Sequence, residues 1–315
     1  MAERFLFFGV STHGSSIMRV FPLWAEALGL DAEIAGRDIP IGASAADYRD
    51  AVQAVRADRS VRGGLVTSHK VAFFEHAADL FDELDDEARR CGEISCLAKR
   101  GPTLRGVAKD PIIAARVLGE LLPDDRWRRT GGHALILGAG GAGTALSVAL
   151  LSAGSPPARV VVTDTDPGQL RRLAEVHRRL AAAVPVDYRL VGSAGDSDSL
   201  VAGLPPGSLV VNATGVGKDF PGSPLSDDAV FPVDGVAWEL NYRGDLAFLG
   251  QARRQSAARR LRVENGWAYF VQAWVEVIEE VFERPISPAE VVHLAELADG
   301  QRPGVQPAPA EEAGR

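Results

Sequence analysis

A glycine-rich turn between two apolar segments, residues 133–145 (HALILGAGGAGTA), constrains the fold of this chain more than any other stretch. Four apolar residues predict a buried strand, and an apolar helix is expected over about 144–151. Between them, Gly138, Gly140 and Gly143 satisfy the spacing G-x-G-x-x-G. The first glycine allows a tight turn, the second lets the backbone approach a pyrophosphate, and the third packs helix against strand. The stretch therefore predicts dinucleotide binding, with a glycine turn that only packs as the alternative.

The helix that follows such a turn directs its free N–H groups at the phosphates. The candidate cofactor-binding residues of the turn are accordingly Gly138, Ala139, Gly140, Gly141 and Ala142.

An acidic residue about 20 positions after the last glycine commonly holds the ribose 2′-hydroxyl, and Asp164 stands there. A carboxylate at that place repels a 2′-phosphate, and no Arg or Lys occurs between Arg159 and Arg171 to receive one. These residues predict that NAD is favoured over NADP as cofactor. The alternative is that Asp164 only caps the helix that begins after Asp166 and Pro167.

The rest of the chain alternates strands and helices at a spacing that predicts parallel βαβ units. In the first half, strands are expected over 5–10, 31–38, 61–67, 93–98 and 104–108, with helices over 17–28, 45–56 and 111–122. In the second half, strands are expected over 159–163, 186–191, 208–213, 236–240 and 261–263, with helices over 167–182, 267–282 and 288–297. The pattern indicates an α/β fold with two domains.

Composition excludes several classes of partner. A net charge of −8 argues against nucleic acid, which requires a basic face. No apolar run reaches the roughly 18 residues of a membrane span, and no signal peptide is expected, so we predict a cytoplasmic protein. Cys91 and Cys96 are expected to be reduced, buried thiols. The histidines show no metal-ligand spacing, so no metal is expected.

Two charged residues stand at strand-to-helix transitions, where α/β proteins gather their functional groups. Lys70 directly follows the strand over 61–67, and Asp110 precedes the helix over 111–122. A lysine beside a carboxylate can carry a proton to or from a hydroxyl or carbonyl oxygen. The alternative is that both residues are simply solvated.

The order of segments, up to about residue 297, resembles the shikimate/quinate dehydrogenase family. That family ends a strand in N-V-T-x-P-x-K, and here residues 64–70 are GLVTSHK, which keeps Lys70 and offers the hydroxyl of Thr67. The family's G-A-x-N-T-L becomes GEISCL at 92–97, with Ser95 in place of asparagine. Its G-x-N-T-D becomes GVAKD at 106–110, which keeps Asp110. The resemblance implies that Lys70 and Asp110 are the catalytic pair.

The second half resembles the family more closely. The glycine turn is unchanged, whereas the family's N-R-T is TDT at 163–165, with Asp164 in place of an arginine that would hold the NADP phosphate. The family's N-A-T-S-x-G beside the nicotinamide is NATGVG at 212–217, and its D-x-x-Y is ELNY at 239–242. The resemblance implies further cofactor contacts for Asn212, Ala213, Thr214 and Gly215, and substrate contacts for Tyr242 and Gln272.

The site for the substrate carboxylate departs most from the family. The family's H-S-x-S-P is HGSSI at 13–17, so Ser16 is kept, Ser15 lies beside it, and Gly14 replaces a serine. Losing such a hydrogen-bond partner costs on the order of 1–3 kcal/mol. The changes at Gly14 and Ser95 predict weaker shikimate binding, or another substrate such as quinate, an amino analogue or a cyclitol.

The resemblance implies an N-terminal α/β substrate-binding domain over 1–110, completed by a returning C-terminal segment over 265–298, a Rossmann NAD(P)-binding domain over 111–264, and a disordered tail over 299–315. It implies reversible hydride transfer between NAD(P) and a hydroxylated cyclohexene or cyclohexane carboxylate, of the 3-dehydroshikimate/shikimate type, by a monomer or homodimer. The alternative from another class is a relative that binds NAD(H) without catalysis.

Overall fold

The computed structural model describes residues 2–180, 182–218 and 220–303. The predicted tail over 299–315 therefore lies mostly outside the described residues, and Asp299 itself is the last residue of helix α12 (Pro288–Asp299). The chain divides into two compact α/β units. Unit 1 comprises Met1–Asp85, Glu93–Val107 and Trp274–Arg315, and unit 2 comprises Asp86–Gly92 and Ala108–Ala273. The predicted α/β class is confirmed.

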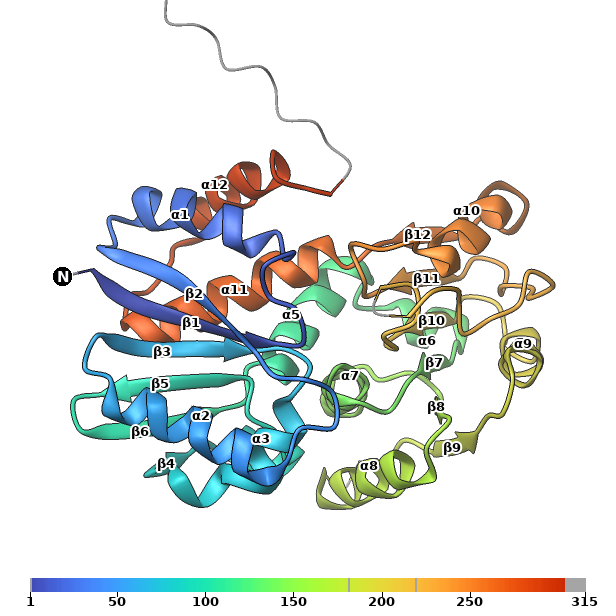
Figure 1. The fold of residues 1–315 in the computed structure, drawn as a ribbon. Helices are drawn as coiled ribbons and strands as arrows, with labels where there is room; N and C mark the ends of the chain where they lie inside the picture. The colour runs from blue at the N-terminus through green and yellow to red at the C-terminus, as the bar shows by residue number, and fades with distance from the viewer. Residues whose placement is uncertain (1, 181, 219, 304–315) are drawn as a thin grey trace, which may run out of the picture. The chain divides into compact units, whose positions relative to one another are not determined.

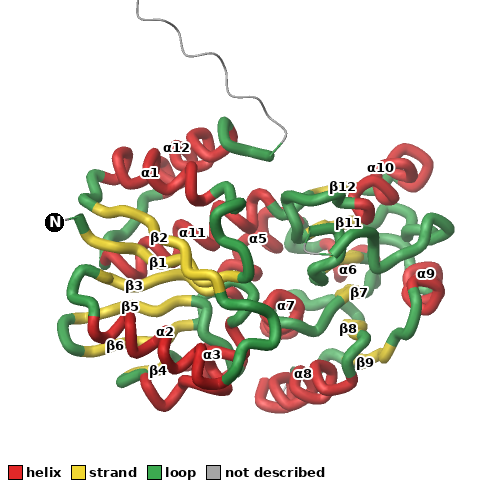
Figure 2. The backbone as a smooth tube through the Cα atoms, in the orientation of Figure 1, coloured by secondary structure: helices red, strands yellow, loops and turns green. Residues whose placement is uncertain are grey.

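Unit 1 contains a six-stranded mixed sheet with the order β2-β1-β3-β5-β6-β4 (Figures 1 and 2). Its strands are β1 (Glu3–Gly9), β2 (Ala32–Asp38), β3 (Val61–Val66), β4 (Glu83–Leu84), β5 (Cys96–Arg100) and β6 (Thr103–Val107). Strands β2, β1 and β3 are parallel, whereas β5 is antiparallel to both β3 and β6. The carboxyl ends of β1 and β3 and the amino end of β5 therefore meet at one edge of the sheet.

Helices cover this sheet with their apolar side chains. They are α1 (Ile17–Leu28), α2 (Ala45–Ala57), α3 (Lys70–Ala77), the short 3-10 helix η1 (Ala78–Leu80), α12 and the later part of α11 (Trp267–Phe282). The ring of Phe5 lies 5.7 Å from the rings of both Trp274 and Phe282, so the first strand packs directly on α11. Helix α1 lies beside α12 in Figure 1, and Trp24 Nε1 donates to the Leu294 carbonyl at 2.8 Å. This bond satisfies the one polar group of a fully buried side chain.

Unit 2 contains a fully parallel sheet with the order β12-β11-β10-β7-β8-β9. Its strands are β7 (Ala134–Leu137), β8 (Val160–Asp164), β9 (Val186–Leu190), β10 (Leu209–Asn212), β11 (Val236–Glu239) and β12 (Arg262–Glu264). The chain order reverses between β7 and β10. In open parallel sheets this switch point, at the carboxyl ends of the strands, is where ligands bind.

The helices of unit 2 are α4 (Asp86–Cys91), α5 (Asp110–Leu121), α6 (Arg126–Thr130), α7 (Gly141–Ser152), α8 (Pro167–Leu180), α9 (Ala194–Ala202), α10 (Ala247–Arg259) and the first part of α11. Helices α7, α9 and α10 are among the elements that differ from the sequence analysis. Helix α7 begins at Gly141, inside the glycine turn, rather than near residue 144. Helix α9 is short and rich in serine and aspartate, and α10 lacks a clear apolar stripe, so neither shows the periodicity that predicts a helix.

A buried histidine joins α7, α8 and β9. His177 Nε2 lies 2.8 Å from Ser147 Oγ, and Nδ1 lies 2.8 Å from the Tyr188 hydroxyl. Because Ser147 donates its own proton to the Thr144 carbonyl, His177 Nε2–H is the donor and Nδ1 accepts from Tyr188. Burial lowers the pKa of His177 from 6.5 to about 4, so the ring stays neutral at physiological pH.

This network predicts a specific loss of stability in acid. The unfolded histidine takes up a proton near pH 6.5 and the folded one only near pH 4, so stability falls as pH falls through this range. The full loss is on the order of 3 kcal/mol below pH 4. Urea unfolding of wild type and His177→Gln between pH 8 and 4 measures it: the wild-type advantage should shrink with acidity. The exposed His293 gives the matched control, His293→Gln, and equal slopes for wild type and His177→Gln would contradict the assignment.

Candidate active site

The glycine turn of unit 2 connects β7 to α7 and brings backbone segments into close contact. Gly138 has φ +106, a conformation that residues with a Cβ rarely adopt. A Cβ on Gly143 would lie 2.0 Å from the Gly138 carbonyl oxygen, whereas a Cβ on Gly140 would meet no atom within 4 Å. Gly138 therefore makes the turn, Gly143 allows helix and turn to touch, and Gly140 faces open space.

That open space belongs to a cavity of about 520 Å³ at the carboxyl ends of β7, β8 and β10. The predicted cofactor residues that line it are Gly138, Gly140, Asp164, Ala213, Thr214 and Gly215. The sequence analysis missed the opposite wall, which the start of α9 supplies through Ser193, Ala194 and Ser197. Only the turn and the loop after β10 carry a recognisable motif; the α9 wall depends on where a short, unpatterned helix packs.

Charged side chains of opposite sign fix the residue at the tip of the turn. Asp164 accepts a hydrogen bond from the Ala139 N–H at 2.7 Å and another from the Asp166 N–H at 2.9 Å. Arg172, from α8, donates to the Ala139 carbonyl at 2.9 Å and to Thr144 Oγ1 at 3.0 Å. Asp164 therefore supports the turn itself, and a guanidinium lies against the same peptide.

The predicted substrate residues of unit 1 gather at the edge where β1 and β3 end. Thr67 donates both its N–H and its hydroxyl to the Phe8 carbonyl, at 3.0 and 3.2 Å. Ser95 lies directly beside them, because its carbonyl accepts from the Val66 N–H at 2.9 Å. The Ile94 N–H donates to the Lys70 carbonyl at 2.9 Å, so the segment before β5 is joined to the first turn of α3.

The residue before Lys70 is held on both sides. His69 is 5% exposed, its Nε2–H donates to the Ile39 carbonyl at 2.8 Å, and its Nδ1 accepts from the Tyr48 hydroxyl at 3.1 Å. Burial lowers the pKa of His69, which keeps the ring neutral in this role. The residue before Lys70 is therefore held in place at the start of α3, and the side chain of Lys70 is half-buried.

The loop after β1 carries the two predicted serines. Asp38, at the end of β2, accepts from the Thr12 N–H at 2.8 Å and from its hydroxyl at 2.6 Å, which holds the pKa of Asp38 below its usual value. The Ser15 N–H then donates to the Thr12 carbonyl at 3.0 Å, and Ser16 stands immediately before α1. Both serines are almost fully buried.

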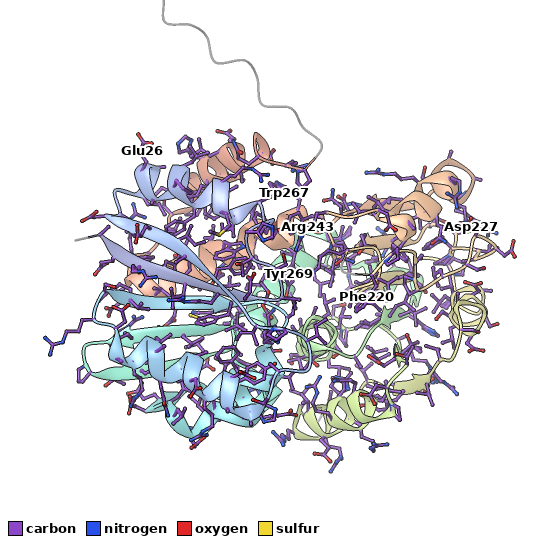
Figure 3. All side chains as sticks on the ribbon, viewed as in Figure 1. Glu26, Phe220, Asp227, Arg243, Trp267 and Tyr269 are labelled. Carbon is purple, nitrogen blue, oxygen red and sulfur yellow. The ribbon has the colours of Figure 1, made fainter. Side chains whose placement is uncertain are left out.

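The remaining predicted residues belong to unit 2. Asp110 is the buried first residue of α5, where a carboxylate favours the helix dipole. The ring of Tyr242 packs on Phe270 and Trp267, with centroids 4.5 and 5.4 Å away, and Figure 3 labels Trp267 near the start of α11. Gln272 is buried and its Oε1 accepts from Arg116 at 3.3 Å. Lys70 belongs to unit 1 and Asp110 to unit 2, so the pairing of these two residues stays a prediction.

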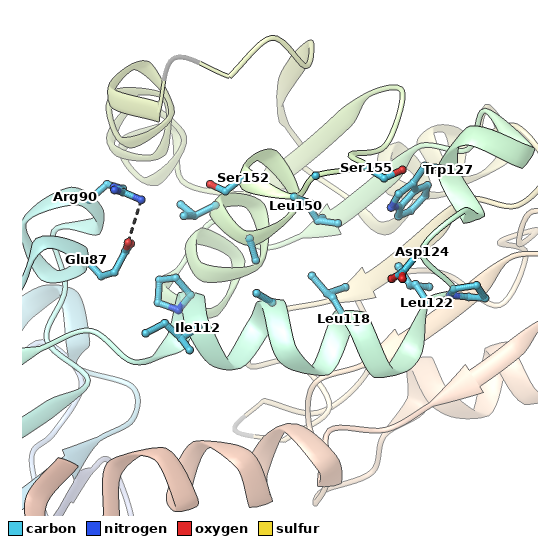
Figure 4. A pocket seen from close by; sticks show the side chains of 18 residues that line it. Glu87, Arg90, Ile112, Leu118, Leu122, Asp124, Trp127, Leu150, Ser152 and Ser155 are labelled. Carbon is cyan, nitrogen blue, oxygen red and sulfur yellow. Dashed lines mark ion pairs between the residues drawn. The ribbon is translucent and has the colours of Figure 1, made fainter. Parts of the chain in front are cut away.

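A second cavity of unit 2, of about 680 Å³, lies between the sides of α5 and α7 (Figure 4). Its wall is mainly apolar, and an ion pair of 3.0 Å between Arg90 and Glu87 stands at one end. None of the predicted site residues lines it. Among the described residues, no group of three His, Cys, Asp or Glu side chains could hold a metal ion, and no helix has the length and hydrophobicity needed to cross a bilayer.

The parallel sheet, the glycine turn and the cavity at the switch point define unit 2 as a Rossmann-type dinucleotide-binding fold, accompanied by a second α/β unit with polar side chains at its strand ends. This is the architecture of two-domain nicotinamide-dependent dehydrogenases.

Known proteins specify the class further, although no family model matches the chain. Shikimate dehydrogenase (NADP(+)) of Methylobacterium radiotolerans is 34% identical over 247 residues, which cover 75% of this chain and 77% of the relative. The enzyme of the same name from Rhodospirillum rubrum is 31% identical over 200 residues, 63% of this chain and just under two thirds, 64%, of the relative. Shikimate 5-dehydrogenase from Thermus thermophilus, solved with NADP(H) and shikimate, has a TM-score of 0.68 at 25% identity and covers 94% of this chain and 99% of its own.

The chain belongs to the shikimate dehydrogenase family. It is a shikimate dehydrogenase-like oxidoreductase that acts on a CH–OH group with a nicotinamide dinucleotide, as the resemblance in sequence implied.

One prediction requires correction. The expectation that NAD is favoured over NADP is contradicted by the relatives, which are NADP(+) enzymes by name. The prediction assigned Asp164 to the ribose, whereas its two oxygens accept from the backbone of Ala139 and Asp166, the second bond being in accord with the alternative of a cap on the next helix. Arg172, just beyond the stretch 160–170 that lacks Arg and Lys, donates to the Ala139 carbonyl of the glycine turn. An acidic residue after the second strand of such a sheet is therefore not sufficient to predict whether the cofactor is NAD or NADP.

Proposed function

We propose that this enzyme catalyses reversible, NADP-dependent hydride transfer on a hydroxylated cyclohexene carboxylate of the shikimate/3-dehydroshikimate type. The observation that carries the proposal is Lys70, which begins α3 at the carboxyl end of β3, among the hydroxyl groups of unit 1 and directly after the fixed ring of His69. A proton carrier requires such a fixed place beside groups that can hold a polyol.

Unit 2 is proposed to hold the dinucleotide. The N–H groups at the start of α7 suit the pyrophosphate, with Gly140 leaving room for its approach. The loop 213–215 along the cavity wall suits the nicotinamide. When bound, the dinucleotide supplies the acceptor or donor of the hydride.

The chain's own residues are proposed to bind the substrate and move its proton. Lys70 takes the proton of the reacting hydroxyl as the hydride leaves its carbon, and returns it in the reverse direction, while Asp110 orients that hydroxyl. Hydrogen-bond donors and acceptors for the ring hydroxyls and the carboxylate are supplied by Ser15, Ser16, Thr67, Ser95, Tyr242 and Gln272.

Two positions favour a second candidate substrate, quinate. Gly14 and Ser95 are smaller than the serine and asparagine that the family has there. Smaller side chains leave room for the additional ring hydroxyl of quinate, and an amino analogue and a cyclitol are the further alternatives. We further propose a cytoplasmic location for the enzyme, because Cys91 and Cys96 are buried free thiols.

Initial rates with shikimate and with quinate, each with NADP and with NAD, test the proposal. We expect turnover of shikimate with NADP, and a slower reaction with quinate. Faster turnover of quinate would assign the second substrate. An enzyme that binds NADP but oxidises neither acid, nor an amino or cyclitol analogue, would refute the catalytic proposal and favour a relative that only binds the dinucleotide.

A further inference from the structure

A fully buried glutamate lies beneath the loop that lines the cofactor cavity. Glu239 is the last residue of β11 and is 0% exposed. Its carboxylate accepts three hydrogen bonds: from Asn212 Nδ2 at 2.7 Å, and from the N–H and Nδ2 of Asn241, both at 2.8 Å. All three partners are donors, so both carboxylate oxygens must act as acceptors.

The two asparagines extend this arrangement to the loop 213–217. Asn212 Oδ1 accepts from the Thr214 N–H at 3.1 Å and from its hydroxyl at 2.6 Å. Asn241 Nδ2 also donates to the carbonyls of Thr214 and Val216, at 3.2 and 3.3 Å. Because Thr214 and Val216 line the cofactor cavity, the shape of its wall depends on how the two amides are oriented.

We propose that Glu239 is a positioning residue whose ionised carboxylate fixes the loop 213–217 in the shape that binds the nicotinamide half of the dinucleotide. The inference rests on the proposed function of unit 2 as the dinucleotide site. Glu239 itself acts through Asn212 and Asn241 rather than by touching the cofactor.

Protonation of Glu239 disfavours this arrangement, because three donors already face its carboxylate. A protonated carboxyl group turns one acceptor oxygen into a donor, which then faces an N–H group. Turning the Asn212 amide over relieves that conflict, but it directs Nδ2 at the Thr214 N–H and removes the Nδ2 bond to the Val216 carbonyl, while the Thr214 hydroxyl must change from donor to acceptor. The observed conformation of the loop is therefore favoured by the ionised form of Glu239.

The surroundings of Glu239 bring the pKa of its carboxyl group into the neutral range. Burial raises the pKa of Glu239 from 4.5 to about 7, although the hydrogen bonds from the asparagines oppose the rise. The nearby carboxylate of Asp245 raises it further, and Lys218 and Arg243 are the cationic residues of the same two loops. The carboxylate is ionised above this pKa, so the ordered loop is favoured as pH rises and lost as pH falls.

The test measures NADPH binding to the full chain by fluorescence between pH 8.5 and 5.5. With a binding-competent fraction of about one tenth at pH 6, the apparent dissociation constant of wild type should rise about tenfold relative to pH 8. Glu239→Gln should bind at least tenfold more weakly at pH 8 and retain only the titration of the dinucleotide's own phosphate. Glu264→Gln, a half-exposed glutamate on β12, is the matched control and should follow wild type.

An exchange of the two side chains makes the test independent of any general damage by the single variant. In the double variant Asn212→Asp/Glu239→Gln, the carboxylate at 212 accepts from Thr214 and from the amide at 239, which in turn accepts from Asn241. The Val216 carbonyl loses the donor Asn212 Nδ2, at 3.2 Å, and keeps Asn241 Nδ2, at 3.3 Å. Affinity should recover to within about threefold of wild type. A wild-type profile parallel to that of Glu239→Gln, or a folded double variant that fails to recover, would overturn the inference. Failure of wild type to bind at pH 8.5 would instead refute the proposed function.

Discussion

Replacing Lys70 with alanine is expected to lower kcat by about 10²–10⁴-fold, the usual contribution of a positioned acid or base. The dissociation constant of the dinucleotide should change by less than about twofold, because Lys70 belongs to unit 1 and the cofactor cavity is built from unit 2. Steady-state kinetics with shikimate and NADPH fluorescence measure the two quantities separately.

Lys70→Arg is the informative companion variant. It keeps a positive charge at the start of α3, but a guanidinium does not give up its proton at neutral pH. If Lys70 transfers a proton, Arg should be nearly as inactive as Ala. Full activity of the arginine variant would show that only charge matters, and wild-type turnover of Lys70→Ala would remove Lys70 from the mechanism.

The second large effect is expected from substituting two glycines of the same turn. The two substitutions should impair different properties, stability in one case and dinucleotide affinity in the other. In Gly143→Ala the new methyl group would lie 2.0 Å from the Gly138 carbonyl oxygen, so backbone must move. We expect the free energy of unfolding to fall by about 3 kcal/mol, the upper range for overpacking, with loss of dinucleotide binding.

Gly140→Ala should leave stability within about 0.5 kcal/mol, because its Cβ meets nothing within 4 Å and its φ of −69 suits any residue. The methyl group would instead stand where the pyrophosphate approaches, so affinity for NADPH should fall by at least tenfold, or about 1.4 kcal/mol. Urea unfolding and NADPH titration of both variants separate the roles. Equal loss of stability in the two variants, or unchanged affinity in Gly140→Ala, would contradict the geometry.

The sequence was sufficient to predict those parts of the site that depend on the backbone conformation of a few consecutive residues. The glycine spacing predicted the turn, because the conformation of Gly138 and the contact of Gly143 are properties of a few consecutive residues. Most strands of both sheets were predicted from the sequence, whereas the two-residue strand β4 was not. The family resemblance placed Thr67 and Ser95 in one substrate site, but their gathering at one sheet edge does not follow from local patterns, since it depends on the antiparallel pairing of β5 with β3.

Contacts between distant segments explain what sequence reasoning missed. Glu239 looked like an imperfect match to a family acid, and its bond to Asn212 appears only when β10 and β11 are paired. The position of Asp164 predicted either a ribose contact or a cap on the next helix, and its bond to the Asp166 N–H fits the cap, whereas its bond to the glycine turn had no signal in the sequence. Such networks have no periodicity to detect, because each consists of single polar residues from separate elements.

The most direct test of the central claim follows the hydride itself. The enzyme is incubated with NADP⁺ and with shikimate that carries deuterium on the carbon bearing the reacting hydroxyl, and the reduced dinucleotide is examined by NMR. The proposed function predicts deuterium at C4 of the nicotinamide and a ketone in the product. Reduced dinucleotide without deuterium, or bound NADP⁺ with no reduction, would contradict it.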